Sequence, residues 1–411
     1  MKSLIGVLMG VIILCSLIFG TLSLALSKDN HTNPSPYSKS TPYYNTEHAM
    51  FVFTGSYREI GRKYAAAIPM SENLLMAKIY IQNLDDHKRK ELMRRINTAK
   101  NMLITFHPAL YQMINGVLDV YNEHTMEEII LLSFITVLTN WGSSGSCGSV
   151  GFLVNGKPVI GQNLDLGRSN SFTVAYMLPD HGLAYWTHVD PGFPWFTVGI
   201  NEAGFCISGA SVNSNKKDDH HDVLFPYELI SNYLLAQARD VHSAYNLLEK
   251  LPPRGPISDG MNLMTADSTG AIRLFEISSE RIIQIDKKTY PIITTNHYTS
   301  TALKHLNRND KKTLFLLENS LERYHYAKEY FIKNDLNADN LRILLRETGK
   351  EGRWCREDIE PDIGYTSASY IFNLDRKQFE YWIGIPESNP VHHILSLKAL
   401  FGRTIIPTNS P

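Results

Sequence analysis

The stretch Gly145-Ser-Cys-Gly-Ser-Val-Gly-Phe-Leu-Val-Asn-Gly-Lys-Pro-Val-Ile-Gly-Gln-Asn-Leu-Asp165 decides how this chain folds. Residues 150–154 are rich in types that favour a β-strand, and Asn155-Gly156 is the preferred two-residue hairpin turn. Residues 158–162 return from that turn as a second strand. The stretch therefore predicts a β-hairpin in which a strand, and not a helix, follows Cys147.

Cys147 and Asp165 lie at the same end of this hairpin. Counting outward from the turn, Gly148 faces Asn163. Cys147 then begins the first strand, and Asp165 lies just beyond its partner on the second. Small residues flank the thiol, so that a backbone or a substrate can approach it closely. A thiol is mostly protonated near neutral pH and needs a base to act as a nucleophile.

Further segments follow a recognisable order along residues 51–386. They are Gly55-Ser-Tyr-Arg-Glu-Ile-Gly61, Cys147, Gly161-Gln-Asn-Leu-Asp165, Gly199-Ile-Asn-Glu-Ala-Gly204, Thr295-Asn296-His297 and Ser320-Leu-Glu-Arg323. In this order they resemble the acyl-coenzyme A:6-aminopenicillanate acyltransferase family of N-terminal nucleophile (Ntn) hydrolases. That family is also called the C45-type peptidases and is related to the choloylglycine hydrolases and penicillin V acylases.

The resemblance implies an α+β fold, namely a four-layer αββα Ntn-hydrolase sandwich. It also implies cleavage of the Ser146–Cys147 bond, which would make the Cys147 amine the catalytic base. The expected enzyme transfers the acyl group of a linear amide to water or to an amine through a thioester on Cys147. Its expected partner is a small N-acyl amide, with no metal and no organic cofactor.

The resemblance also assigns three supporting residues. Asp165 would hold the new ammonium or the thiol, Asn296 would donate to the oxyanion, and Arg323 would support the site. The alternatives are a turn or capping role for Asp165, an Asx-turn for Asn296 and a helix-surface salt bridge for Arg323. Gln162 departs from the choloylglycine hydrolases, which usually have Arg there. The roles of Ser211 and Asn213 stay open.

The N-terminus predicts an export signal in front of the fold. Residues 4–26 carry no charged side chain and follow Lys2. A spanning helix needs about 20 apolar residues, so this run favours an uncleaved signal-anchor over a cleaved signal peptide. We divide the chain into residues 1–27 (signal-anchor or signal peptide), 28–46 (a polar, proline-bearing linker), 47–146 (a helical segment and expected α-chain) and 147–411 (the Ntn core and expected β-chain). The catalytic part is expected outside the cytoplasm, either membrane-anchored or secreted or periplasmic.

Composition narrows the classes of function. The formal net charge of −1 gives no electrostatic case for a nucleic-acid partner. Of the four cysteines, Cys15 lies in the N-terminal apolar run. We expect structural roles for Cys206 and Cys355 and the nucleophile role for Cys147. The sequence does not fix the oligomeric state.

Hydrophobic periodicity places helices before the hairpin, from Gly55 to about Leu138, and strands after it. Later helices are expected at residues 226–250, 313–333 and 337–348. Strands are expected at residues 173–178, 184–188, 195–200, 205–208, 262–265, 272–277, 282–285, 292–295 and 370–385. Strands, then helices, then strands again suit sheets covered by helices.

Three other classes of protein stay open at this point. A papain-like cysteine protease would use Cys147 with His297, but it needs a helix after the cysteine. A metal hydrolase would use Asp218-Asp-His-His-Asp222, in which adjacent histidines do not easily face one ion. A membrane-tethered binding protein could keep the fold without the activity.

Overall fold

The computed structural model describes residues 43–45, 50–134, 147–166, 173–189, 198–212, 214, 227–251, 260–278, 281–285, 289–308, 314–349, 353–356, 365–384 and 392–402. The apolar run 4–26, Ser146, Asn213 and the run 218–222 of the metal alternative lie outside these residues. Within the described part of the chain, no helix is long and apolar enough to cross a membrane.

The strands form two sheets. The larger sheet has the order β1-β2-β5-β6-β7-β8-β9-β10-β11. Its strands are β1 (Tyr43–Asn45), β2 (Met50–Gly55), β5 (Thr173–Pro179), β6 (Tyr185–Val189), β7 (Gly199–Asn201), β8 (Cys206–Val212), β9 (Gly260–Ala266), β10 (Ile272–Ile277) and β11 (Ile282–Ile285). The smaller sheet has the order β12-β3-β4-β13-β14-β15. Its strands are β12 (Ile292–Thr294), β3 (Gly148–Val154), β4 (Lys157–Leu166), β13 (Tyr365–Asn373), β14 (Gln378–Ile383) and β15 (His392–Ser396).

The described helices lie between and after the strands. The first group is α2 (Tyr57–Ala67), α3 (Ser71–Gln82), α4 (Asp86–Phe106), α5 (Pro108–Val120) and α6 (Met126–Ser133). The others are α8 (Tyr227–Gln237), α9 (Val241–Glu249), the short 3-10 helix η1 (Lys304–Leu306), α10 (Leu314–Lys333), α11 (Ala338–Leu345) and α12 (Leu397–Phe401). Local sequence sets several starts: Ser56 with Glu59, and Thr125 with Glu128, form capping boxes.

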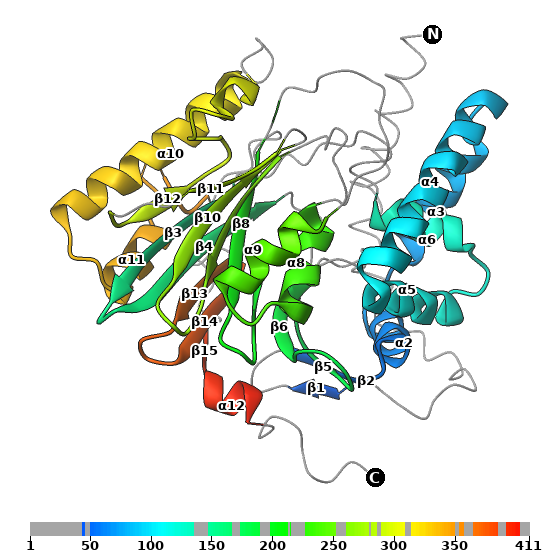
Figure 1. The fold of residues 1–411 in the computed structure, drawn as a ribbon, viewed down its shortest axis with the longest axis horizontal. Coiled ribbons are helices and arrows are strands. Elements are labelled where there is room, and N and C mark those ends of the chain that lie inside the picture. The colour runs from blue at the N-terminus through cyan, green and yellow to red at the C-terminus, as the bar shows by residue number, and fades with distance from the viewer. Residues whose placement is uncertain are drawn as a thin grey trace.

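Buried apolar side chains separate into clusters between these elements. One cluster joins helices α2–α6, α8 and α9 to the larger sheet, and a second fills the space between the two sheets. A third joins α10 and α11 to the smaller sheet. Figure 1 shows α10 and α11 beside β3, β4 and β12, with α2–α6 gathered at the opposite side of the molecule. Helix α12 brings Phe401 against Tyr176 of β5, so the C-terminal end of the described chain contacts the larger sheet.

The predicted hairpin is confirmed residue by residue. Gly148 pairs with Asn163 and Val154 with Lys157. Asn155 and Gly156 both have positive φ, at 50° and 74°, as a type I′ turn requires. The mixture of helices and sheets is likewise confirmed.

Other sequence predictions need correction. The segment 47–146 is not only helical, because β2 within it pairs in parallel with β5. The single helix expected at 226–250 is two helices, because Asp240 forms a capping box with Ser243 and starts α9. The strand region expected at 370–385 is a hairpin of β13 and β14. Strand β15 and helix α12 were not predicted from the sequence.

Candidate active site

Cys147 lies immediately before β3, with its side chain in the cluster between the two sheets and only 4% exposed. The next residue, Gly148, faces the opposite side. A Cβ atom there would lie 2.9 Å from the Trp354 ring and 3.3 Å from Arg323 Nη1. Glycine is therefore needed so that the backbone beside the thiol can approach Trp354 and Arg323 closely.

Arg323 of α10 joins Cys147 to Asn296. Its Nη1 donates to the Cys147 carbonyl oxygen at 2.9 Å, and its Nη2 donates to Asn296 Oδ1 at 2.7 Å. Its Nε donates to Asn319 Oδ1 at 3.1 Å, and its own carbonyl accepts from the Trp354 indole at 2.9 Å. The guanidinium is thus held through all three of its nitrogens. Arg323 is 1% exposed, so the helix-surface salt bridge considered from the sequence is wrong.

Asn296 follows β12 and is buried. Its Nδ2 donates to the Ser211 carbonyl oxygen at 2.7 Å, while Arg323 holds its Oδ1. An amide nitrogen carries two hydrogens, and the bond to Ser211 uses one of them. Because Ser211 and Arg323 are far away in the sequence, these bonds favour a role at the site over a local turn.

The segment around Asn296 is fixed from both sides. Asn262 Nδ2 donates to the carbonyl oxygens of Thr295 and His297, each at 2.8 Å. On the other side, Ser320 Oγ lies 2.8 Å from His297 Nδ1 and donates to Thr295 Oγ1 at 2.9 Å. Ser320 and Arg323 are three residues apart, on one face of α10. The Ser-x-x-Arg spacing therefore lets one helix hold both the segment and the Asn296 side chain.

Asp165 lies within β4, fully buried, so the turn or capping role considered from the sequence is wrong. Its Oδ1 accepts from the Thr366 hydroxyl at 2.7 Å, and its Oδ2 lies 3.7 Å from Arg356 Nε. Burial raises the pKa of Asp165 from 3.8 to about 6, although Arg356, Arg323 and Thr366 favour the ionised form. The carboxylate is thus ionised at neutral pH and close to protonation in mild acid.

Arg323 is a cation near neutral pH. Burial is the largest influence on its guanidinium and lowers the pKa to about 10, with Arg356 acting in the same direction. Asp165 and Cys147 oppose this shift. Arg323 therefore interacts electrostatically with both groups and connects them within the site.

Sequence reasoning missed several residues at this site. Arg356, Thr366 and Trp354 contact Asp165 or Arg323 as described above, and Asn163 Nδ2 donates to the carbonyl oxygens of Leu345 and Trp354. Arg356, Thr366 and Trp354 come from segments that match no motif, so their spacing gave no signal. Asn163 lies in the motif Gly161–Asp165, but the motif gave it no role of its own. Gln162 instead faces the larger sheet, where its Nε2 donates to the Gly209 carbonyl oxygen at 2.6 Å.

The other cysteines fit the structural roles expected for them. Among the described residues, Cys147, Cys206 and Cys355 form no disulfide. Cys206 and Cys355 are fully buried. Burial raises the pKa of the Cys206 thiol well above its usual range, which disfavours a thiolate there. Among these three, Cys147 is the residue whose backbone carbonyl accepts a hydrogen bond from Arg323.

The site thus holds a buried cysteine before a strand and an arginine that joins its backbone to an asparagine amide. The chain belongs to the acyl-coenzyme A:6-aminopenicillanic acid acyl-transferase family, whose model matches residues 154–384, more than half of the sequence. This family lies among the Ntn hydrolases, so the protein is an enzyme of the amide hydrolase and acyltransferase class. No curated protein matches the sequence significantly.

Several solved structures are similar. A mutant of the conjugated bile acid hydrolase from Clostridium perfringens has 14% identity and a TM-score of 0.44, over 61% of this chain and 92% of that one. Penicillin V acylase from Agrobacterium tumefaciens has 14% identity and a TM-score of 0.36, over 58% of this chain and 82% of that one. The Caenorhabditis elegans ortholog of N-acylethanolamine-hydrolyzing acid amidase has 9% identity and a TM-score of 0.36, over 56% and 92%.

Proposed function

We propose that the protein is a cysteine Ntn amidohydrolase or acyltransferase, which cleaves the linear C–N amide bond of a small N-acyl substrate through a thioester on Cys147. The observation that carries this proposal is the bridge made by Arg323 between the Cys147 carbonyl and the Asn296 amide. It holds a thiol-bearing residue and a side-chain amide donor in one rigid unit. A papain-like protease requires a helix after its cysteine, whereas the β3–β4 hairpin follows Cys147.

Maturation by cleavage of the Ser146–Cys147 bond is part of this proposal. The cleavage would give a β-chain of residues 147–411, and it would free the Cys147 α-amine. A free α-amine has a pKa near 8, which suits proton transfer at mild pH. Arg323 supports this role because its bond to the Cys147 carbonyl oxygen fixes the backbone of the proposed nucleophile.

In the first half-reaction, the Cys147 sulfur attacks the substrate carbonyl carbon and the thiol proton passes to the α-amine. Negative charge then develops on the carbonyl oxygen, and an Asn296 N–H is the donor proposed to stabilise it. The C–N bond breaks, the leaving amine takes the proton from the Cys147 ammonium, and the acyl group stays on sulfur as a thioester.

In the second half-reaction, water or an acceptor amine attacks the thioester carbonyl. The α-amine accepts the proton of the attacking group and returns it to the departing Cys147 sulfur. Water gives a carboxylic acid, and an amine gives a new amide. No step requires a metal ion or an organic cofactor.

The fold supports the same assignment. Helices cover the outer faces of two stacked sheets, and we propose that this is the αββα sandwich of the Ntn hydrolases. We also propose that the enzyme works outside the cytoplasm, because residues 4–26 are uncharged and long enough to span a membrane. Protease accessibility of the catalytic part in intact cells tests that location.

Intact-mass analysis of the wild type, Cys147→Ala and Cys206→Ala tests the proposal. We expect two chains in the wild type and in Cys206→Ala, which removes another buried thiol, and one unprocessed chain in Cys147→Ala. The same preparations are then assayed against N-acyl amino acids and N-acyl amines, with activity lost only in Cys147→Ala. A wild type that stays one chain and still hydrolyses amides would contradict the α-amine mechanism.

A further inference from the structure

The short segment Arg353–Arg356 ties together four parts of the fold. The Trp354 indole donates to the Arg323 carbonyl at 2.9 Å, and the Trp354 carbonyl accepts from Asn163 Nδ2 at 2.8 Å. The Cys355 N–H donates to the carbonyl of Glu347, just after α11, at 2.8 Å. The Arg356 backbone then pairs with Thr366 of β13. The segment therefore has a fixed position beside the proposed site.

Arg356 reaches Asp165 by two routes. Its backbone N–H donates to Thr366 Oγ1 at 2.8 Å, and the Thr366 hydroxyl donates to Asp165 Oδ1 at 2.7 Å. A hydroxyl has one hydrogen, so accepting from Arg356 leaves that hydrogen directed at the carboxylate. The Arg356 guanidinium also lies 3.7 Å from Asp165 Oδ2. Both side chains are almost fully buried, at 5% and 0% exposure.

The backbone geometry of β13 supports this arrangement. The pairing of β13 with β4 shifts register between Thr366 and Ala368, opposite Asp165 and Leu164. Such a bulge redirects the side chains next to it and is common beside active sites. Here it lets Thr366 contact Asp165 while Ser369, further along, contacts Asn163 Oδ1.

We propose that Arg356, acting directly and through Thr366, is a positioning residue that keeps the Asp165 carboxylate ionised and oriented for the Cys147 reaction. This role rests on the proposed function. Arg356 itself is not assigned any contact with the substrate.

The charged groups around Asp165 predict the direction in which its pKa changes when Arg356 is replaced. Three groups face the Asp165 carboxylate: the Arg356 guanidinium, the Arg323 guanidinium from α10 and the Thr366 hydroxyl from β13. Cys147 lies beside Arg323. Burial raises the pKa of Asp165 to about 6, and Arg356 is the largest influence that opposes burial. Removing the Arg356 charge should therefore raise the pKa of Asp165 further, so that the carboxyl is partly protonated at neutral pH.

The test measures the ionisation of Asp165 directly, by NMR of protein labelled with ¹³C in its aspartate carboxyls. The Asp165 signal is assigned by its absence in Asp165→Asn. We expect Arg356→Gln to raise the pKa of Asp165 by about one unit or more, the usual effect of one nearby opposite charge. Arg356→Lys should raise it less, because it keeps the charge. Thr366→Val, which removes only the hydroxyl relay, should also raise it and provides a test if Arg356→Gln does not fold.

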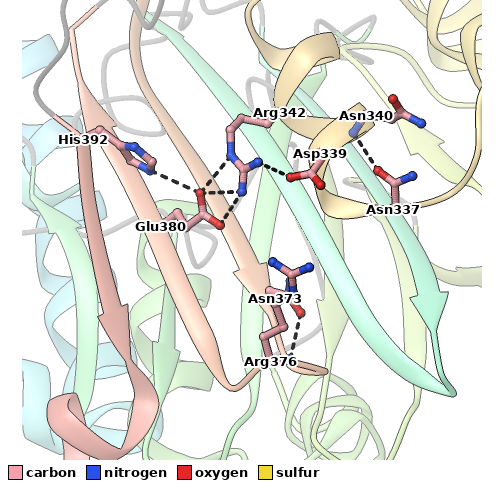
Figure 2. Close-up of polar contacts among 8 residues, drawn as sticks. All are labelled: Asn337, Asp339, Asn340, Arg342, Asn373, Arg376, Glu380 and His392. Atoms are coloured by element: carbon pink, nitrogen blue, oxygen red, sulfur yellow. Dashed lines mark hydrogen bonds and ion pairs between the residues drawn. The ribbon is translucent and has the colours of Figure 1, made fainter.

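Arg342→Gln is the matched control. Arg342 binds Glu380 through Nε and Nη2 at 3.1 and 2.8 Å and also binds Asp339, as Figure 2 shows. It is another arginine paired with a buried carboxylate, that of Glu380 on β14 of the smaller sheet. It should leave the pKa of Asp165 unchanged.

Measurements of amide turnover distinguish a failure of this inference from a failure of the proposed function. For amide hydrolysis, the acidic limb of the pH–rate profile should move upward by the same amount as the Asp165 pKa in Arg356→Gln, and not in Arg342→Gln. An unchanged Asp165 pKa in both Arg356→Gln and Thr366→Val would overturn the inference whatever the activity. A raised pKa without a shift of the acidic limb would also overturn it. A wild type without any amide turnover would overturn the proposed function instead.

Discussion

At the scale of single residues, the site depends on a few buried side chains that each make several directed bonds. Arg323 donates to three acceptors, and a guanidinium has a fixed donor geometry that suits this task. It binds Cys147 and Asn296 at once. The catalytic contribution of Asn296 can therefore be separated from the support given by Arg323.

Asn296→Ala should lower kcat by about 10²–10³, the usual loss for one oxyanion donor, and leave the protein folded. Steady-state kinetics with a thermal melt measures both effects. Asn319→Ala is the control, because Asn319 also accepts from Arg323 but has no proposed contact with the substrate. It should change kcat by less than tenfold. A collapse of thermal stability in Asn296→Ala, with normal turnover per folded molecule, would show that Asn296 is only structural.

Asp165 should set the acidic limb of activity. Because its pKa is raised to about 6, amide turnover should fall as the pH drops through that value and the carboxyl becomes protonated. Asp165→Asn should remove this limb and reduce kcat by about 10²-fold or more, as for the loss of a preorganised electrostatic contact. Asp339→Asn, at an exposed acid paired with Arg342, should keep the wild-type profile. If Asp165→Asn left the acidic limb of the pH–rate profile unchanged, the titration of another group would cause that limb. The direct approach of Asp165 to the Cys147 amine or thiol, within about 4 Å, stays a prediction.

At the scale of secondary-structure elements, the sequence predicted those features that depend on residues close together in the chain. The Asn155-Gly156 turn fixes the register of β3 and β4, so their pairing could be counted from the sequence. The six ordered motifs also indicated four candidate site residues, namely Cys147, Asp165, Asn296 and Arg323. The bulge at Thr366, strand β15 and the contact of Arg356 with Asp165 depend on partners far away in the sequence. No local pattern encodes such contacts, so the sequence did not reveal them.

The junction of α5 and α8 should make stability depend on pH. His107 caps α5 through Nδ1, which accepts from the Leu110 N–H at 3.4 Å, and its Nε2 donates to Asn232 Oδ1 of α8 at 2.6 Å. Burial lowers the pKa of His107 from 6.5 to about 4. Because the folded-state pKa is the lower one, its stabilising contribution is present above pH 6.5 and is lost as the pH falls toward 4. The full effect is about 3 kcal/mol in the free energy of unfolding.

His107→Gln should therefore flatten the dependence of stability on pH across this window, measured by urea unfolding at several pH values. It should also cost about 1 kcal/mol at neutral pH, through the weakened cap. His181→Gln, at an exposed histidine, is the control and should keep the wild-type slope. Asp165 acts in the opposite direction, because its raised pKa makes stability fall as the pH rises from 3.8 to about 6. An unchanged slope in His107→Gln would show that this histidine does not titrate on unfolding.

At the scale of the whole molecule, residues 50–134, which precede Cys147, are integrated into the fold. Strand β2 pairs in parallel with β5, from Met50 opposite Val174 to Gly55 opposite Pro179. Phe53 of β2 and Ile60 and Tyr64 of α2 belong to the same buried cluster as Met177 of β5. Cleavage before Cys147 would therefore leave two chains that share one sheet and one hydrophobic core.

The two chains should stay together after cleavage. We expect them to co-elute in gel filtration in native buffer and to separate on a denaturing gel, because dissociation would expose the core around Phe53 and open the β2–β5 pairing. Phe53→Ala should cost about 3–5 kcal/mol, the usual loss for a buried phenylalanine, and should release the N-terminal chain at lower urea concentrations. Leu75→Ala, at a side chain on α3 that is 52% exposed, should leave the release midpoint unchanged. Separation of the wild-type chains in native buffer would mean that the segment before Cys147 acts as a removable pro-segment, even though β2 pairs with β5 in the larger sheet.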